Sequence, residues 1–312
     1  MSYGQYKTQT ALLVTLKAEG ASVPSHAISD PGLLEVIAFG DEAEVQYGHI
    51  PAEGRPQYCF CKWFKMLLHS ETTSSESDPV IESDENGLRI TLSAALALSI
   101  GVFKKTAIDH LARTYRRTSS PAINTASSPD IVWILTVPAI WSDKAKYLMR
   151  CAAYNAKLVP NFDSNNLILC LEPEGISFAA LFDASCDDTF IRDYVGEESK
   201  ESFSTKDVFS RRGNKFLVVD AGGGTVDFGA YEVVSTHPFQ VKQLAAPVGG
   251  PFGSTQVDLC LKEFIFELIG PEATAVLKKD IASVYELLSK WETVKINAGH
   301  IRNEDLSYNW RI

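Results

Sequence analysis

The sequence predicts an α/β fold in which short apolar strands are followed by helices. Apolar runs at 131–137 and 167–171 each precede a stretch with apolar residues at helical spacing, an order typical of α/β proteins. A third apolar strand, 216–220, runs into the turn Asp220-Ala-Gly-Gly-Gly-Thr-Val-Asp227. Consecutive glycines at a strand end are typical of a turn whose backbone approaches a phosphate group.

The first third of the chain contains two predicted strands and one long predicted helix. Apolar runs at 11–16 and 33–39 predict the strands, and the Asp30-Pro-Gly turn between them indicates a hairpin. Apolar residues at helical spacing from Leu92 to Leu111 predict the helix. Ser-, Thr- and acid-rich stretches on both sides of this helix predict solvated loops.

The runs at 131–137 and 167–171 are almost entirely apolar. Such runs predict strands that are covered on both faces, as in a parallel sheet between helices. Ser142 and Asp143 predict a helix start after the first run, because a serine caps free N–H groups and an acid suits the helix dipole. Residues 176–182 predict a helix after the second run.

A polar, charge-mixed stretch in the middle of the chain is the clearest internal boundary. It predicts a first lobe over 1–183, a charged insert over 184–213 and a second lobe over 214–312. In the second lobe a strand at 226–234 follows the glycine turn. Two helical regions with apolar stripes follow a second turn, Gly249-Gly-Pro-Phe-Gly253.

Composition narrows the classes of function. The formal net charge is −10, and an acidic chain repels a phosphate backbone, so nucleic acid is not an expected partner. The cysteines and histidines show no metal-ligand spacing, so a structural metal is not expected. The sequence has no apolar run of membrane-spanning length and no secretory signal at its start. We therefore expect, by default, a cytoplasmic protein with no membrane partner.

The turn from Asp220 to Asp227 indicates phosphate chemistry. Its glycines let backbone N–H groups reach phosphate oxygens with no Cβ in the way. Thr225 can donate its hydroxyl to a terminal phosphate, and Asp220 can order water around Mg²⁺. An ordinary hairpin with a glycine turn is the simpler alternative. The P-loop and dinucleotide patterns do not fit, because no Gly-Lys-Ser/Thr follows and a strand, not a helix, comes after the glycines.

Three further places are candidates, each with a simpler structural explanation. The Glu172-Pro pair could orient an attacking water for phosphoryl transfer, or could simply begin a helix. The pair Gly249-Gly250 could approach a nucleotide closely, or could form a turn. Glu292 and Lys295 share a helical face, and a surface ion pair is the simpler interpretation of their spacing.

In their order along the chain, these motifs resemble the heat-shock 70 kDa chaperone family, whose ATPase domain has the two-lobed actin-like (ribonuclease H-like) fold. The similar motifs are Val137-Pro-Ala-Ile-Trp-Ser-Asp143, Leu169-Cys-Leu-Glu-Pro173, Val218-Val-Asp-Ala-Gly-Gly-Gly-Thr-Val-Asp227, Gly249-Gly250 and Trp291-Glu-Thr-Val-Lys295. Features that resemble the divergent branch typified by heat-shock 70 kDa protein 12 are Trp141, the insert before the glycine turn, Val23-Pro-Ser25, Phe39-Gly-Asp-Glu-Ala43 and Lys62-Trp-Phe-Lys65.

This resemblance implies a site for ATP or ADP with Mg²⁺. In that site Asp220 is the acid that holds magnesium through water, and Glu172 lies near the catalytic water. The implied nucleotide-binding residues are Gly222, Gly223, Gly224, Thr225, Asp227, Gly249, Gly250, Glu292 and Lys295. Co-chaperones or client proteins are the implied partners, and no peptide-binding domain is expected in this chain.

The chain also departs from the family's pattern. No aspartate precedes Asp30, so the family's first phosphate turn is not found, and the chain ends before the late Gly-Gly-Ser-type adenosine turn. Ile296 stands where the family has an arginine, and Glu174-Gly175 where it has Thr-Ala. We therefore expect an incomplete nucleotide-binding domain, truncated at both ends. Because the donors of a phosphate clamp act together, its ATP hydrolysis is expected to be weak or lost.

Three functions remain open from the sequence. The first is an ATP-binding, chaperone-like ATPase domain. The second is a degenerate relative: a pseudo-ATPase, a non-catalytic interaction module or a gene fragment. The third is an actin-fold sugar or acetate kinase, which fits residues 220–225 but fits neither Val137-Pro-Ala nor the helix after Glu172-Pro173.

Overall fold

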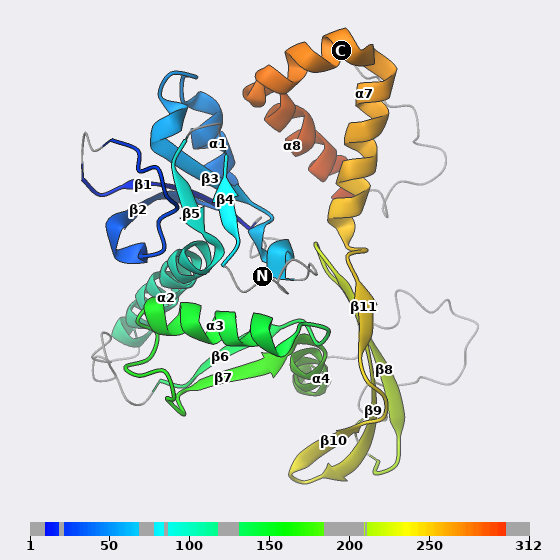
Figure 1. Ribbon diagram of the computed structural model, residues 1–312. Helices are drawn as coiled ribbons and strands as arrows, with labels where there is room; N and C mark the ends of the chain where they lie inside the picture. Colours follow the sequence, from blue (N-terminus) through cyan, green and yellow to red (C-terminus); the bar gives the residue numbers. More distant parts are fainter. Residues whose placement is uncertain are drawn as a thin grey trace.

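The computed structural model describes residues 10–18, 22–68, 78–83, 87–117, 131–183, 209 and 211–297. The predicted loop at 118–130, most of the predicted insert and the tail from residue 298 lie outside these residues. Figure 1 shows the later elements, from β8 onward, lying along one side of the earlier ones. The division into two lobes with an insert between them stays a prediction.

Strands and helices are mixed along the whole described chain. Up to residue 183 they are β1 (Ala11–Leu16), the 3-10 helix η2 (Pro31–Leu33), β2 (Leu34–Phe39), α1 (Asp41–His49), η3 (Arg55–Gln57), β3 (Tyr58–Lys62), η4 (Phe64–Leu68), β4 (Val80–Glu82), β5 (Arg89–Thr91), α2 (Leu92–Arg117), β6 (Trp133–Val137), α3 (Asp143–Asn155), β7 (Leu167–Leu171) and α4 (Glu172–Asp183). After it come β8 (Lys215–Ala221), β9 (Val226–Thr236), β10 (Phe239–Gln243), β11 (Val248–Gly250), α7 (Ser254–Lys279) and α8 (Ile281–Asn297). The predicted α/β class is confirmed.

The described strands form small separate sheets. The first is antiparallel with the order β2-β1-β3, which confirms the predicted pairing of the two N-terminal strands. Strands β4 and β5 form a hairpin, and β6 pairs with β7 in parallel. In the last sheet β8, β10 and β11 all pair antiparallel with β9. None of the helices in the described ranges combines the length and apolar character that a membrane span requires.

Two helix starts bear on the site. Ser142 caps α3 as predicted, because its Oγ accepts a hydrogen bond of 3.2 Å from the N–H of Ala145. Helix α4 begins at Glu172, earlier than the predicted start at residue 176. Proline is well suited to the first helical turn, where its missing N–H has no partner in any case. Glu172 therefore lies where β7 passes directly into α4.

The largest apolar core lies between the first sheet, α2 and α3. Phe64 and Leu68 are buried in it, and they hold the short turn η4 in place. Val137 and Trp141 are buried in the same core and fix the end of β6. A shared core therefore holds η4 and the β6 end at fixed positions, because a close-packed interior allows little displacement.

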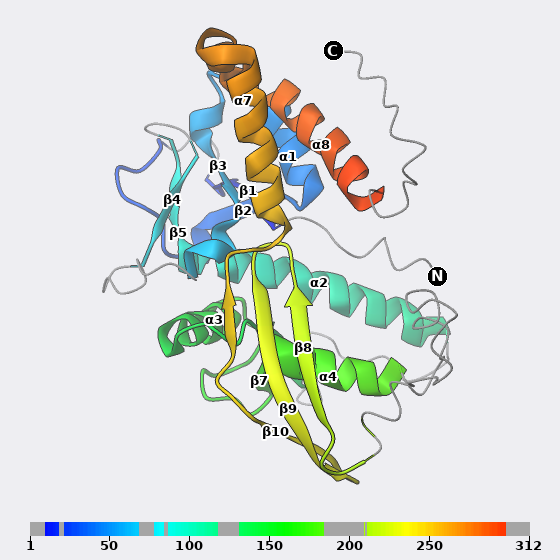
Figure 2. The same ribbon diagram turned by 90° about the vertical axis from the view of Figure 1, so that its right-hand side faces the viewer.

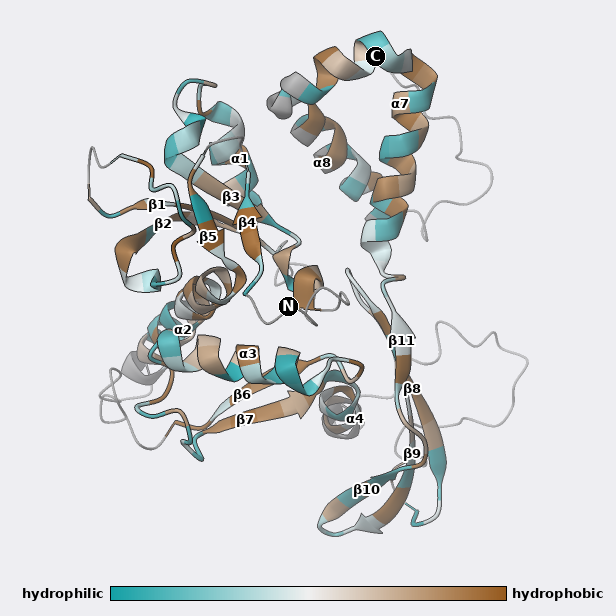
Figure 3. Cartoon of the chain, in the orientation of Figure 1, coloured by the Kyte–Doolittle hydropathy of each residue, from teal (hydrophilic) through white to brown (hydrophobic). Residues whose placement is uncertain are grey.

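The prediction that the runs at 131–137 and 167–171 are covered on both faces is wrong. Ile134 is 61% exposed and Ile168 is 46% exposed. Within the described chain β6 pairs only with β7, and the core covers only the face that carries Trp133 and Leu135. A sheet buried on one side shows alternating burial even when its sequence is uniformly apolar. Figure 3 shows the apolar colouring of β7.

Candidate phosphate-binding site

A cavity of about 220 Å³ lies where the glycine turn meets η4 and the end of β6. Its lining comes from segments far apart in the sequence: Lys65, Met66, Pro138, Trp141, Glu172, Asp220, Gly222, Gly223, Gly224 and Thr225. The structure therefore brings Glu172 together with Asp220 and the glycine turn. Lys65 and Met66 were not among the predicted site residues.

The glycine turn is held from behind by the start of α7. The turn is closed by a hydrogen bond of 2.9 Å from the N–H of Gly222 to the carbonyl of Thr225. The first N–H groups at α7 donate to the three glycine carbonyls: Gly253 to Gly224 at 3.3 Å, Ser254 to Gly222 at 3.1 Å and Thr255 to Gly223 at 2.9 Å. Figure 2 shows the ends of β8 and β9 reaching the start of this helix.

Gly253 allows this close approach. A Cβ at that position would lie 2.5 Å from the carbonyl oxygen of Gly223, which is too close for any non-bonded pair. The sequence indicates Gly253 only as the end of the second turn, Gly249-Gly-Pro-Phe-Gly253. A glycine directly before a helical apolar stripe is visible in the sequence. Its contact with the first glycine turn forms only in the folded chain, because the two segments are about 30 residues apart.

The opposite edge of the turn offers donors. Within the described chain, the N–H groups of Gly223, Gly224 and Thr225 have no hydrogen-bond acceptor. Consecutive free amides on a turn form a concave site that suits an anion. The positive end of the α7 dipole lies behind the same turn and adds to the attraction for negative charge. This arrangement can bind a phosphate group.

The other wall of the cavity carries an ion pair. Nζ of Lys65 donates to Oε1 of Glu172 at 2.9 Å, and it lies 5.4 Å from the centre of the Trp141 ring. Trp141 is buried and orients the ammonium group from one side. A cation and a carboxylate thus lie together at the cavity, paired with each other.

Asp220 and Asp227 lie directly opposite each other on β8 and β9. Asp227 is fully buried, and neither of its carboxylate oxygens has a hydrogen-bond partner. Two carboxylates at opposed positions repel each other, and an unpaired buried charge is costly. A bound cation would offset both effects.

Asp220 lines the cavity, whereas Asp227 is fully buried and does not line it. Mg²⁺ is usually bound by one or two carboxylates and completes its shell with water and phosphate oxygens. The described residues contain no group of three or more metal-ligating side chains. A magnesium ion at Asp220 would therefore take most of its ligands from water and phosphate.

Other predicted residues lie outside the cavity. Gly249 pairs with Asp227 and Gly250 with Val226 in the β11–β9 ladder. A Cβ on Gly249 would lie 2.5 Å from the carbonyl oxygen of Val226, so this glycine has a packing role next to β9. Neither glycine lines the cavity, and their nucleotide contact stays a prediction.

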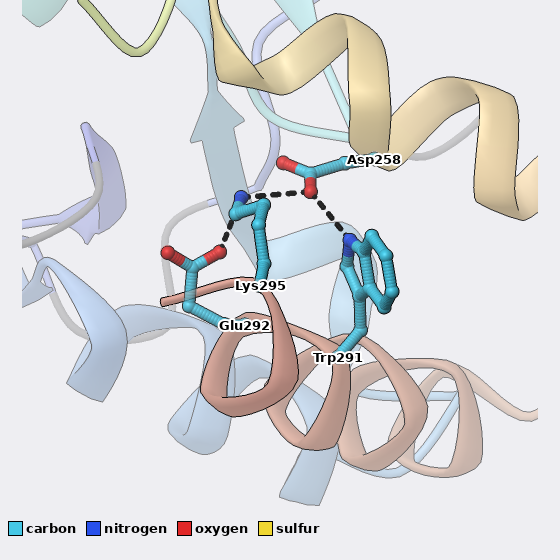
Figure 4. Close-up of polar contacts among 4 residues, drawn as sticks. All are labelled: Asp258, Trp291, Glu292 and Lys295. Atoms are coloured by element: carbon cyan, nitrogen blue, oxygen red, sulfur yellow. Dashed lines mark hydrogen bonds and ion pairs between the residues drawn. The ribbon is translucent and has the colours of Figure 1, made fainter. Parts of the chain in front are cut away.

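Glu292 and Lys295 form a polar cluster between α7 and α8 (Figure 4). Lys295 Nζ lies 2.8 Å from Oδ1 of Asp258 and 2.5 Å from Glu292, and the indole N–H of Trp291 donates to the same Asp258 oxygen at 2.9 Å. Burial alone would lower the pKa of Lys295, but its hydrogen bonds to Asp258 and Glu292 raise this pKa above its ordinary value. Asp258 was missed in the sequence because an acid on an amphipathic helix has no distinctive signal.

No family model matches the chain. It is 28% identical over 300 residues to heat shock 70 kDa protein 12A of Homo sapiens and to that of Mus musculus, which covers 86% of this chain and 43% of either relative. It is 27% identical over 326 residues to heat shock 70 kDa protein 12B of Homo sapiens, which covers 94% of this chain and 43% of the relative.

The chain is a divergent relative of the heat shock 70 kDa protein 12 proteins. The resemblance predicted from the motifs is therefore confirmed. The match to heat shock 70 kDa protein 12B extends over most of the chain, so it is not limited to the glycine turn. The chain spans less than half the length of these relatives.

Proposed function

We propose that this chain is an actin-like nucleotide-binding domain of heat-shock-70 type, which binds Mg-ATP or Mg-ADP at the glycine turn. The observation that carries the proposal is the row of free amides at Gly223, Gly224 and Thr225, opposite Lys65 across one cavity. Nucleotide use is a general property implied by the relationship to heat shock 70 kDa proteins. By the same relationship we propose that co-chaperones or client proteins are its partners.

The cavity matches the phosphate end of a nucleotide. Its volume, about 220 Å³, is below the ~300–1,000 Å³ of pockets that enclose a whole drug-sized ligand. The free amides and Lys65 would hold phosphate oxygens there. The adenosine would extend beyond this cavity, and we propose Glu292, Lys295 and the Gly249-Gly250 strand as its contacts.

Asp220 would hold magnesium through water, with Asp227 behind it as the second carboxylate. When bound, the ion would neutralise the phosphate charge. The Thr225 hydroxyl lines the same cavity and would donate to a phosphate oxygen. Asp220 and Asp227 are paired in the β8–β9 ladder, and Thr225 closes the turn between the two strands through its hydrogen bond with Gly222, so the cradle is present before the ligand arrives.

Hydrolysis would depend on Glu172, whose carboxylate would orient the attacking water. Its Oε1 already accepts a hydrogen bond from Lys65, so this oxygen is less available to orient a water molecule. We therefore propose slow turnover. Binding without hydrolysis is the second candidate, and the Lys65–Glu172 ion pair is the observation that favours it.

Calorimetric titration with Mg-ATP tests the binding. We expect heat from the unmodified chain and none from Asp220→Ala or Gly223→Val. A Cβ at Gly223 meets no atom within 4 Å and Gly223 lines the cavity, so a valine side chain would take space that the phosphate needs. Asp163→Ala, at an exposed acid away from the cavity, is the matched control and should bind normally. No heat from the unmodified chain at high concentration would exclude the proposed function.

A phosphate-release assay then separates the two candidates. Slow release that is abolished in Glu172→Gln supports hydrolysis at this site. Binding with no release supports the non-catalytic candidate. A rate of phosphate release that is unchanged in both Glu172→Gln and Asp220→Ala would show that the site is assigned wrongly.

A further inference from the structure

Met66 lies directly against the glycine turn. A Cβ built on Gly224 would be 2.5 Å from Met66 Sδ, so the sulfur occupies the space that any other residue would need for its side chain. Met66 also lines the cavity beside Lys65. This thioether thus touches the part of the turn that carries the free amides.

The position of Met66 is held by its neighbours. Phe64 and Leu68, at the two ends of η4, are almost fully buried. The N–H of Met66 donates to the carbonyl of Trp63 at 2.9 Å. Met66 itself is only partly buried and lines the cavity, so its side chain is open to small solutes from that side while its backbone stays in place.

We propose that Met66 is a redox modification site: a peroxide converts its thioether into a sulfoxide, and the added oxygen blocks the phosphate cavity. The effect on nucleotide rests on the function proposed above. The residue is distinct from the other described methionine, Met149, which packs on the apolar core from α3. Because Met66 contacts Gly224, an oxygen added to its sulfur lies next to the glycine turn.

The chemistry needs only the peroxide. The sulfur lone pair attacks one peroxide oxygen, the O–O bond breaks, and a new S–O bond forms. The displaced hydroxide takes the proton from that oxygen and leaves as water. Sulfur is oxidised by two electrons and the peroxide is reduced by two. The reverse reaction, with a thiol reductant and a methionine sulfoxide reductase, restores the thioether and releases water.

The product differs from the thioether in polarity and size. A sulfoxide oxygen accepts hydrogen bonds, and the donors that line the same cavity include the free amides of Gly224 and Thr225 and the ammonium of Lys65. These are the donors that would bind phosphate. An oxygen that occupies them competes with the ligand, and it also places a negative dipole next to the phosphate oxygens.

The full chain is treated with hydrogen peroxide, and peptide mass mapping follows sulfoxide at Met66 and Met149. We expect Met66 to gain oxygen, and Mg-ATP affinity to fall about tenfold as it does. Met66→Gln, a polar mimic of the sulfoxide, should show the same loss without peroxide. Met66→Leu conserves volume and cannot be oxidised, so its Mg-ATP affinity should be the same before and after peroxide treatment. Met149→Leu is the matched control, and its Mg-ATP affinity should still fall after peroxide treatment.

Amide hydrogen exchange of the peptide that contains residues 222–225 gives a readout without nucleotide. We expect slower exchange in the oxidised chain and in Met66→Gln, because their turn amides acquire an acceptor. Failure of the unmodified chain to bind Mg-ATP would exclude the proposed function but leave this readout intact. Unchanged exchange after Met66 is oxidised, resistance of Met66 while Met149 reacts, or equal peroxide sensitivity in Met66→Leu would each overturn the proposal.

Discussion

Lys65 Nζ lies 2.9 Å from Glu172 Oε1, which links η4 to the first residue of α4 across 107 positions of sequence. Glu172 is 18% exposed and Lys65 is 40% exposed. The pair therefore lies at the edge of the cavity, with its carboxylate on the more buried side. Each partner can be removed separately, which distinguishes binding from catalysis.

We expect Lys65→Met to weaken Mg-ATP binding by about tenfold or more, because a cation that faces phosphate is lost. Glu172→Gln should bind as tightly as the unmodified chain or a few-fold more tightly, since Lys65 is then free to contact phosphate. Any phosphate release should fall about 100- to 10,000-fold in Glu172→Gln. Calorimetry and a phosphate-release assay measure the two effects. Equal losses of binding in both variants would contradict this division of roles.

Alanine substitutions at Gly253 and Gly223 should affect different quantities, the first stability and the second Mg-ATP affinity. Gly253→Ala places a Cβ 2.5 Å from a backbone oxygen, and we expect it to lower the free energy of unfolding by about 1–3 kcal/mol. Gly223→Ala meets nothing within 4 Å, so its unfolding free energy should stay within about 1 kcal/mol while its Mg-ATP affinity falls. Denaturant titration reports the first quantity and calorimetry the second. A lower unfolding free energy for Gly223→Ala than for Gly253→Ala would argue against the contact between α7 and the turn.

Tyr231 on β9 has a buried hydroxyl with no hydrogen-bond partner. Burial raises the pKa of this hydroxyl, and the nearby Glu174 and Cys170 raise it further. Removing an unpaired buried polar group removes its desolvation cost, so Tyr231→Phe should raise the free energy of unfolding by about 1 kcal/mol. Tyr147→Phe, at a 58% exposed tyrosine, is the matched control and should change stability by less than about 0.5 kcal/mol. A less stable Tyr231→Phe would show that the hydroxyl is hydrogen-bonded in solution.

Lys62 on β3 should make stability depend on pH. Burial lowers its pKa to about 8, while Asp258 and Asp41 act against this shift and Lys262 adds to it. Its ammonium forms an ion pair with Glu44 on α1 and is mostly buried. A lysine with a lowered pKa binds its proton more weakly in the folded chain than in the unfolded chain. The unfolding free energy should therefore rise with pH between about 8 and the ordinary lysine value of about 10.4.

Comparison with Lys62→Met isolates this effect, because the other titrating groups are shared. The unmodified chain should gain stability relative to the variant across that window, by at most about 3 kcal/mol. Urea denaturation at several pH values measures the difference. Parallel pH profiles for the two proteins would contradict the lowered pKa.

Local sequence patterns predicted most elements correctly. The strand Ala11–Leu16, the helix cap at Ser142 and the strand–turn–strand around the three glycines all appear where expected. Each depends on residues that are neighbours in the chain, so short-range preferences are sufficient. Burial was predicted less well: the run at 131–137 does form a strand, but Ile134 is exposed because coverage depends on what packs against the sheet.

The sequence by itself determined the glycine turn, from Asp220 to Thr225, and the relationship to heat shock 70 kDa proteins. Both follow from motif order and from the freedom of glycine to approach a ligand closely. Only the tertiary structure decided what faces the turn: Lys65 and Met66 from η4, and Gly253 at the start of α7. These contacts join residues far apart in sequence, and a shared core, not any local preference, sets their distances.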